Sequence, residues 1–210
     1  MIYVENKRRK IERIKVQYPN ADILDVTSTS NLRYAQLLSP FYPHGNIPIP
    51  FSPGYISYCV EGIWQGLKVF ESCGIDMNSF SNKTMAGLKR TTSRYGRPLG
   101  HQKGINSTEL LDYFEARMLI YLPSYKWVLE NVPEVVEIIE RIKQRCITND
   151  IVFLDYNTNI DICNISSPIS HAGLIKLYIE NRYPDSNGNY VPYHKKRNKK
   201  NYQLALFNND

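Results

Sequence analysis

The sequence lacks the features that mark several large classes of protein. No apolar run approaches the roughly 20 residues that a transmembrane helix requires, so no membrane partner is expected. The first residues, MIYVENKRRKIER, are basic but lead into no apolar segment, which argues against a secretory signal. The four cysteines lie far apart, without a C-x-x-C pair or metal-ligand spacing. We therefore expect a reduced, cytoplasmic protein with no metal and no other cofactor.

Common phosphate-binding and nucleophile motifs are missing as well. The sequence has no Walker loop, no dinucleotide-binding G-x-G-x-x-G and no nucleophile elbow, which disfavours nucleoside triphosphatases, dehydrogenases and hydrolase-fold esterases. Its 210 residues suffice for one domain with a real core, and its 42% hydrophobic and 22% charged content is ordinary. The net charge of +6 mildly favours an anionic partner.

Residues 37–70 form the stretch around which we expect the rest of the chain to pack. The first half is predicted to be a loop, because five prolines between Pro40 and Pro53 deny it helical hydrogen bonds. After Tyr55 the apolar residues recur at helical spacing, which predicts a helix that ends near Gly74.

Glu61 is the one acid in the apolar part of this predicted helix, and Gln65 and Lys68 follow it one and two turns later. A carboxylate one turn into a helix, facing an aromatic loop, is a natural place for chemistry. The alternative is a solvent-exposed side chain that favours the helix N-terminus electrostatically. Spacing by itself leaves both interpretations open.

The remaining pattern predicts an α+β fold, a predominantly helical single domain with a small β-sheet. Two short segments, 21–27 (ADILDVT) and 151–154 (IVFL), predict the strands. Helices are predicted over residues 4–18, from 79–81 through Leu88, and over 107–121, 133–146 and 170–182. The domain is expected to span residues 1–184, and residues 185–210 are expected to be a basic flexible tail that contains HKKRNKK.

Residues 89–104, KRTTSRYGRPLGHQKG, contain five Lys and Arg side chains and no acid. The glycines predict a loop, and a basic loop suits phosphate or other anions. A solvated loop without any ligand is an equal alternative.

Two blocks of the sequence resemble the NADAR (YbiA-like) family. Ser39, Phe41, Tyr42 and Pro43 match the family's S-x-F-Y-P segment, and Glu61, Gln65 and Lys68 match its E-H-x-x-Q-x-x-K-F helix. Gly62 stands where the family usually has histidine, and Val69 intrudes before Phe70. Residues 170–180, SHAGLIKLYIE, are loosely similar to the closing helix of the family, and the W-G element that usually precedes it is missing.

The resemblance implies an N-glycosidase that breaks the bond between C1″ of a ribose and a nitrogen. Members of that family hydrolyse riboflavin-pathway intermediates or remove ADP-ribose from guanine bases in nucleic acid, as in counter-defence or DNA de-modification. Glu61 matches the catalytic glutamate. Asp155 or Asp161 matches the second carboxylate, and Asp155 is preferred because it directly ends the 151–154 strand.

The same resemblance suggests which side chains bind the substrate. Phe41 and Tyr42 would stack a ring, Lys68 with Arg90 or Arg94 would face the diphosphate, and His171 would bond a ribose hydroxyl or simply cap a helix. The full expected set is Ser39, Phe41, Tyr42, Trp64, Gln65, Lys68, Arg90, Arg94 and His171.

The expected partner is therefore ADP-ribosylated nucleic acid or an ADP-ribose-like nucleotide. Two alternatives stay open at this point. One is a non-catalytic nucleic-acid-binding or inhibitor protein that uses the basic segments and the 16 tyrosines as stacking platforms. The other is an N-glycosidase that acts on a small riboflavin-pathway metabolite.

Overall fold

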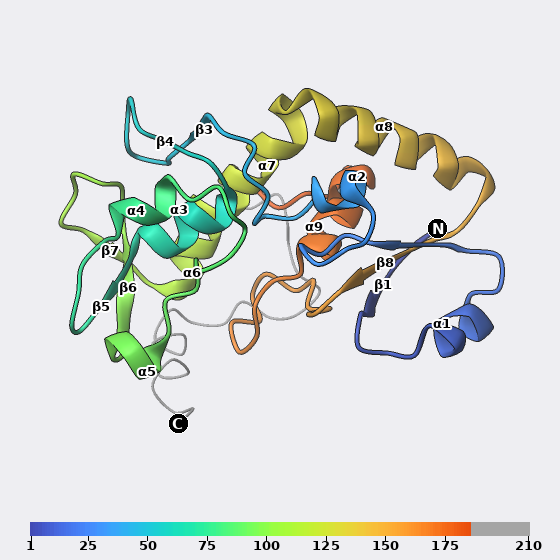
Figure 1. Ribbon diagram of the computed structural model, residues 1–210, viewed down its shortest axis with the longest axis horizontal. Coiled ribbons are helices and arrows are strands. Elements are labelled where there is room, and N and C mark those ends of the chain that lie inside the picture. The colour runs from blue at the N-terminus through green and yellow to red at the C-terminus, as the bar shows by residue number, and fades with distance from the viewer. Residues whose placement is uncertain (186–210) are drawn as a thin grey trace. The chain divides into compact units, whose positions relative to one another are not determined.

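The computed structural model describes residues 1–185, which form an α+β fold (Figure 1). The described chain divides into two compact units: Met1–Ser39 with Leu129–Pro184 is the first, and Pro40–Val128 is the second. The α+β class expected from the sequence is confirmed. The HKKRNKK run lies outside the described residues, and the expected domain boundary at residue 184 stays a prediction. None of the described helices is both long and apolar enough to span a bilayer.

A three-stranded parallel sheet organises the first unit. The unit comprises β1 (Ile2–Asn6), α1 (Ile11–Gln17), β2 (Asp22–Asp25), α2 (Arg33–Gln36), α8 (Pro133–Thr148), β8 (Ile151–Asp155) and α9 (His171–Ile179). β8 is the central strand and pairs in parallel with β1 on one side and β2 on the other. All three strands therefore end at the same edge, with Asn6 opposite Asp155 and Asp25 opposite Leu154.

Burial on both faces explains the composition of β8. All five of its residues are buried, as expected for a central parallel strand that reads as a continuous apolar run. Val152 and Leu154 form a core cluster with Ile14 of α1, and Tyr3 and Tyr18 pack against it. The strands predicted from 21–27 and 151–154 are thus confirmed. The helix predicted over 4–18 is wrong in its first half, because Ile2–Asn6 pairs with a strand about 150 residues away and local spacing carries no sign of that pairing.

The second unit combines short helices with two small antiparallel sheets. Its elements are β3 (Ile47–Pro48), β4 (Ile56–Ser57), α3 (Val60–Gly66), β5 (Lys68–Phe70), α4 (Met77–Phe80), α5 (Thr92–Tyr95), β6 (Pro98–Gln102), β7 (Leu110–Leu111), α6 (Tyr113–Ala116) and a π-helical turn, Arg117–Tyr121. One sheet is the β3–β4 hairpin, and the other has the order β5-β6-β7. Helix α7 (Leu122–Asn131) leads the chain from this unit into the first.

Four sequence-based predictions fail in the second unit. The 89–104 segment was predicted to be a loop, but it contains α5 and β6. The central helix ends at Gly66 instead of Gly74, because Lys68–Phe70 pairs with β6 as a strand. The helix predicted from 79–81 is wrong, since α4 already ends at Phe80 and Met85 has a positive φ of 59°. The helix predicted from 107 begins only at Tyr113, where Asp112 and Glu115 form a capping box.

Two glycines let α3 pack closely against α4. A Cβ on Gly62 would stand 2.5 Å from the backbone oxygen of Ser79, and a Cβ on Gly66 would overlap the ring of Phe80. The backbone N–H of Asp76 also donates to the oxygen of Gly66 at 2.8 Å. This contact explains why position 62 is a glycine, because no side chain fits there.

We expect Gly62→Ala to destabilise the protein by about 1–3 kcal/mol, the usual cost of forcing extra atoms into a packed interior. The backbone oxygen of Ser79 cannot move aside as a flexible side chain could. Gly74→Ala is the matched control, because a Cβ there meets nothing within 4 Å. Urea unfolding of both variants measures the difference, and equal stability of the two would contradict close packing at Gly62.

Candidate functional site

Helix α3 begins where the proline-rich loop meets its first turn. Cys59 has an extended backbone and caps the helix, with its sulfur accepting from the Gly62 N–H at 3.2 Å. The N–H of Glu61 donates to the backbone oxygen of Pro40 at 2.9 Å, which ties the S-P-F-Y-P loop to the helix start. A negative side chain in this first turn is favoured by the helix dipole.

Glu61 is buried rather than exposed, since only 8% of its surface is accessible. One carboxylate oxygen accepts from Nε2 of Gln65 at 2.9 Å, and Oε1 of Gln65 accepts from the backbone N–H of Arg90 at 3.1 Å. Both ends of the Gln65 amide are therefore engaged, and the amide holds the carboxylate in one orientation. The solvent-exposed alternative for Glu61 is excluded by this burial.

The guanidinium of Arg90 donates hydrogen bonds to several backbone carbonyl oxygens. Its Nη1 donates to the backbone oxygens of Gln65 and Lys68, at 3.0 and 2.5 Å, and its Nη2 donates to the oxygen of Gly74 at 2.7 Å. The side chain is buried and its guanidinium also lies 5.0 Å from the Phe70 ring. It joins the end of α3 to β5, so a diphosphate would have to compete with these contacts.

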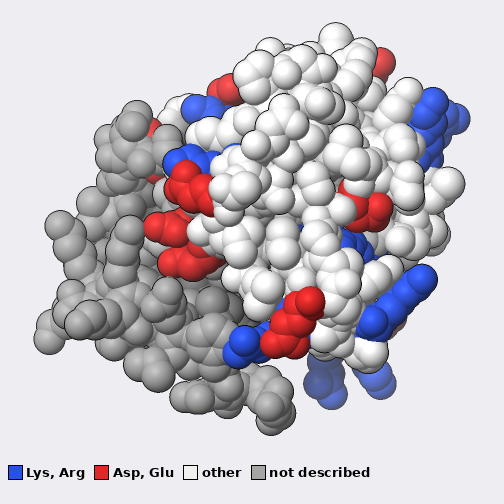
Figure 2. All heavy atoms as spheres, turned by 90° about the vertical axis from the view of Figure 1, so that its left-hand side faces the viewer, with Lys and Arg blue, Asp and Glu red and all other residues white. Residues whose placement is uncertain are grey.

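Lys68 and Arg94 are more accessible cations. Burial lowers the pKa of Lys68, the nearby charge of Glu61 opposes that shift, and Arg90 adds to it. Arg94 is exposed on α5 and its guanidinium lies 5.2 Å from the Tyr95 ring. Figure 2 shows the side of the molecule at the left of Figure 1, where Lys and Arg side chains stand in separate groups with Asp and Glu among them.

Trp64 sits at the centre of a ring cluster that sequence reasoning did not anticipate. Its ring centroid lies 3.8 Å from that of His101, 5.6 Å from Tyr113 and 5.7 Å from Tyr121, the last two in edge contacts. His101 lies on β6, inside the 89–104 segment that was predicted to be a loop. Because a lone histidine in a basic loop carries no signal, only the strand pairing of β6 reveals it.

Arg117 is a second residue that the sequence did not single out. It begins the π-helical turn and only 1% of its surface is accessible, with the guanidinium 5.0 Å from the Tyr113 ring. π-helical turns are rare and are frequent at functional sites. The amphipathic spacing of 107–121 looks like an ordinary helix and gives no indication of this turn.

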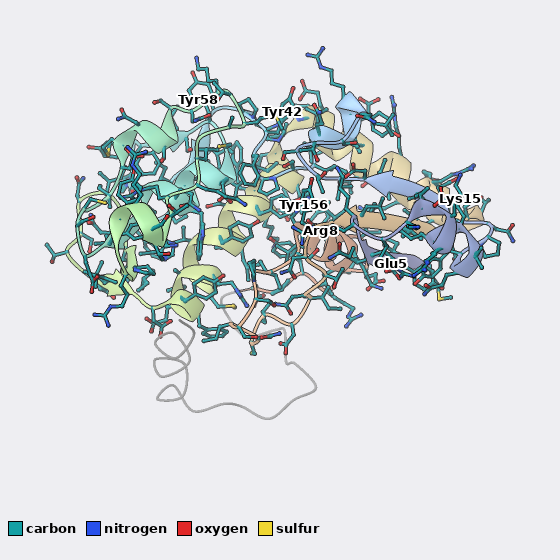
Figure 3. All side chains as sticks on the ribbon, turned by 60° about the horizontal axis from the view of Figure 1, so that its bottom comes forward. Glu5, Arg8, Lys15, Tyr42, Tyr58 and Tyr156 are labelled. Atoms are coloured by element: carbon teal, nitrogen blue, oxygen red, sulfur yellow. The ribbon has the colours of Figure 1, made fainter. Side chains whose placement is uncertain are left out.

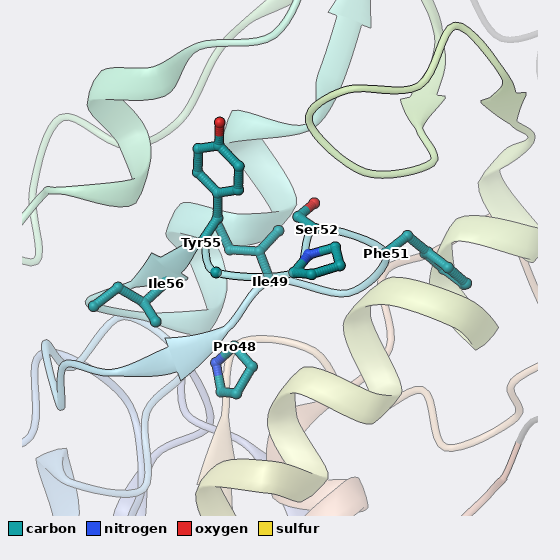
Figure 4. A pocket seen from close by; sticks show the side chains of 8 residues that line it. Pro48, Ile49, Phe51, Ser52, Tyr55 and Ile56 are labelled. Atoms are coloured by element: carbon teal, nitrogen blue, oxygen red, sulfur yellow. The ribbon is translucent and has the colours of Figure 1, made fainter.

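The proline-rich loop itself forms a small apolar pocket. The β3–β4 hairpin forms an open hollow of about 400 Å³ that residues between Pro48 and Ile56 line (Figure 4). No Asp, Glu, Lys or Arg occurs between Tyr34 and Val60, so this surface offers no charged partner for phosphate. Of the predicted stacking residues nearby, Phe41 and Tyr42 are half-buried, and the Tyr42 ring lies 4.9 Å from that of His44.

Asp155 lies in the first unit, at the carboxyl end of β8. Its Oδ2 accepts from Ser170 Oγ at 2.7 Å and from the Ala172 N–H at 3.3 Å, and lies 3.0 Å from His171 Nδ1. Its Oδ1 accepts from the Tyr156 N–H at 2.7 Å. These contacts fasten the start of α9 to the end of the central strand.

Asp155 and His171 are both buried, and each stabilises the charged form of the other. Burial would raise the pKa of Asp155, but the charge of His171 and hydrogen bonds from His171, Ser170 and Ala172 outweigh it and lower the pKa to about 2. Burial would lower the pKa of His171, but Asp155 and a contact with the backbone oxygen of Val26 at 2.9 Å raise it. Asp155 is therefore ionised at neutral pH, and both ring nitrogens of His171 are engaged by protein groups.

Other polar groups at this edge are paired within the first unit. Lys7 Nζ lies 2.6 Å from Asp25 Oδ2 and 2.8 Å from Thr27 Oγ1. The exposed ring of Tyr156 lies beside Arg8, whose guanidinium is 5.7 Å from its centroid (Figure 3). Asp161 is half-buried and its Oδ1 accepts from the Cys163 N–H at 2.9 Å, as in an Asx turn.

The structure thus groups the predicted site residues into two sets. Glu61, Trp64, Gln65, Lys68 and Arg90 lie together in the second unit, and Asp155 and His171 lie together in the first. Ser39 is buried at the end of the first segment of the first unit. Among the described residues, no three His, Cys, Asp or Glu side chains are grouped so as to hold a metal ion.

Comparison with known proteins finds one family. A family model described as a family of unknown function (DUF6939) matches residues 6–175, which includes both groups of side chains. No curated protein and no solved structure matches the chain.

We expect Asp155→Asn to lower the free energy of unfolding by about 3–5 kcal/mol, because it leaves the buried His171 without its charged partner. Asp22→Asn is the control. It removes an ion pair with Arg145 that is about half exposed, and such surface pairs contribute at most about 1 kcal/mol. Urea unfolding of both variants compares them, and a loss from Asp155→Asn no larger than that of the control would contradict the anchoring role.

The same pair predicts how stability depends on pH. The Asp155 pKa is depressed from its ordinary 3.8, so its contribution is present above pH 3.8 and is lost as the pH falls toward 2. The His171 pKa is raised from its ordinary 6.5, so its contribution is present below pH 6.5 and is lost as the pH rises through the raised value. The stability difference between wild type and Asp155→Asn should therefore peak between about pH 4 and 6.5. A difference that is constant from pH 3 to 8 would contradict the coupling.

Proposed function

This chain belongs to the DUF6939 family, and we propose that it is an N-glycosidase that hydrolyses the bond between C1″ of a ribose and a nitrogen. The observation that carries the proposal is Glu61, a buried carboxylate held in place by Gln65 on a helix beside Trp64 and Lys68. The resemblance of this helix to the NADAR motif supports the same assignment.

The chemistry requires negative charge next to C1″. When the C1″–N bond breaks, the nitrogen leaves with the electron pair and takes up a proton, and the ribose passes through a cation shared between C1″ and its ring oxygen. Water then bonds to C1″ and releases a proton. A fixed carboxylate in a water-poor site stabilises the cation more strongly than one in bulk water, and it can also accept the proton of the attacking water.

The two carboxylates that the sequence offered beside Glu61, Asp155 and Asp161, both lie in the first unit, whereas Glu61 lies in the second. Asp155 makes contacts with four protein groups and has a pKa near 2, so it can contribute negative charge but cannot donate a proton at neutral pH. Asp161 has only one oxygen engaged by the Cys163 N–H in the described contacts. The contacts of Asp155 therefore suit it to holding α9.

ADP-ribosylated guanine in nucleic acid is the substrate we propose. Lys68 and Arg94 supply cations for the phosphates, and Phe41, Tyr42 and Trp64 supply rings for stacking. A small riboflavin-pathway metabolite requires the same cleavage at C1″, and assays on both substrates separate the two.

We expect Glu61→Gln to reduce turnover by about a hundredfold or more and to leave substrate binding nearly unchanged, because it removes the charge but keeps the shape. The measurement is release of free ADP-ribose from ADP-ribosylated DNA, followed by chromatography. Glu109→Gln is the matched control, since Glu109 is an exposed carboxylate that pairs with Lys103. Thermal melting of both variants checks that the fold is intact.

Either of two results would overturn the proposal. Full turnover in Glu61→Gln would leave this carboxylate with a structural role only. Absence of product from the wild type on both substrates, together with tight salt-dependent DNA binding, would favour the non-catalytic nucleic-acid-binding protein instead.

A further inference from the structure

His101 is a buried polar ring whose presence the fold alone does not require. It lies on β6 between two strands, directly opposite Lys68 of β5 and Leu111 of β7. Only 2% of its surface is accessible, and neither ring nitrogen makes a hydrogen bond with any described residue. Buried nitrogens without partners destabilise a fold, so an apolar ring would pack here at lower cost.

The surroundings keep this imidazole neutral. Burial, followed by the charges of Lys68 and Arg90, lowers the pKa of His101 to about 3, and a contact with the Trp64 backbone outside hydrogen-bond geometry only partly opposes this. A neutral imidazole has one nitrogen that donates and one that accepts. One of these nitrogens can therefore form a hydrogen bond with a donor or an acceptor on the edge of a base.

Trp64 connects this imidazole with the carboxylate. Its ring is tilted against that of His101, with centroids 3.8 Å apart, and remains partly accessible, while Tyr113 and Tyr121 touch it edge-on. Glu61 and Trp64 are three residues apart on α3, a spacing that places two side chains on neighbouring positions of one helix surface. A ring bound at Trp64 would thus lie close to the carboxylate proposed to act at C1″.

We propose that Trp64 and His101 form the subsite for the planar base of the substrate, with Trp64 stacking on the base and one His101 ring nitrogen binding its edge. This inference rests on the proposed function, because it assigns the leaving base to a place beside Glu61. Because His101 is buried, this assignment requires the Trp64 side chain to rotate when the base binds, and the rotation would change the surroundings of the indole.

Tryptophan fluorescence tests the subsite without any turnover. The chain has two tryptophans, so Trp127→Phe leaves Trp64 as the only one. In that background guanosine should change the Trp64 emission in a saturable way. His101→Phe keeps a flat ring against Trp64 and removes both nitrogens, and we expect it to weaken guanosine binding about tenfold, the effect of losing a hydrogen bond to the base.

Stability measurements separate recognition from a structural role. Because His101→Phe removes buried nitrogens that lack partners, its melting temperature should equal or exceed that of the parent. Tyr95→Phe is the control, because it removes the polar hydroxyl of an aromatic side chain elsewhere in the unit. The Tyr95 ring contacts Phe70 and not Trp64 in the described structure. It should leave guanosine binding unchanged.

The outcomes distinguish this subsite from the glycosidase proposal. Failure of the parent protein to bind guanosine, or unchanged guanosine affinity in His101→Phe, would overturn the subsite even if ADP-ribosylated DNA is cleaved. A lower melting temperature of His101→Phe with unchanged affinity would assign His101 to the core alone. Saturable binding that His101→Phe weakens would support the subsite even if Glu61→Gln shows that no hydrolysis occurs.

Discussion

The close approach of α3 to the end of α4 is the constraint on which the candidate site depends. Gly62 and Gly66 have no room for a Cβ, and the backbone oxygen of Phe80 accepts from the N–H of Tyr58 at 2.8 Å and from Ser57 Oγ at 3.2 Å. The helix is thereby fixed in rotation as well as in position. Because Glu61 and Trp64 each lie within two residues of one of these glycines, this backbone contact fixes the direction in which each side chain leaves the helix.

The sequence predicted helices correctly where the signal lies within a few neighbouring residues. Helix α8 and the start of α9 at Ser170 follow from apolar spacing and from a capping residue within one turn. The failures share a different cause. Lys68–Phe70 and Ile2–Asn6 become strands because they pair with residues about 30 and 150 positions away, and apolar spacing that suits a helix cannot reveal such partners.

The candidate site shows the same division. Glu61 and Gln65 were identifiable because a motif places them one turn apart, and Asp155 because it ends an obviously buried strand. The interactions that decide their chemistry were not visible. The Gln65 amide is oriented by the backbone of Arg90, which is 25 residues away, and the charge of Asp155 is fixed by His171. His101 was hidden because only the pairing of β6 with β5 brings it under Trp64.

The central position of β8 has a consequence for how the chain folds as it is synthesised. β1 and β2 pair only with β8 in this sheet, not with each other, and β8 is translated more than 120 residues after β2. Strands β1 and β2 therefore stay unpaired while the ribosome synthesises Pro40–Val128, a continuous segment that belongs to a different compact unit. Such distant pairing slows folding and leaves open strand edges exposed in the meantime. Lys and Arg side chains between the two strands help to keep that early segment from aggregating.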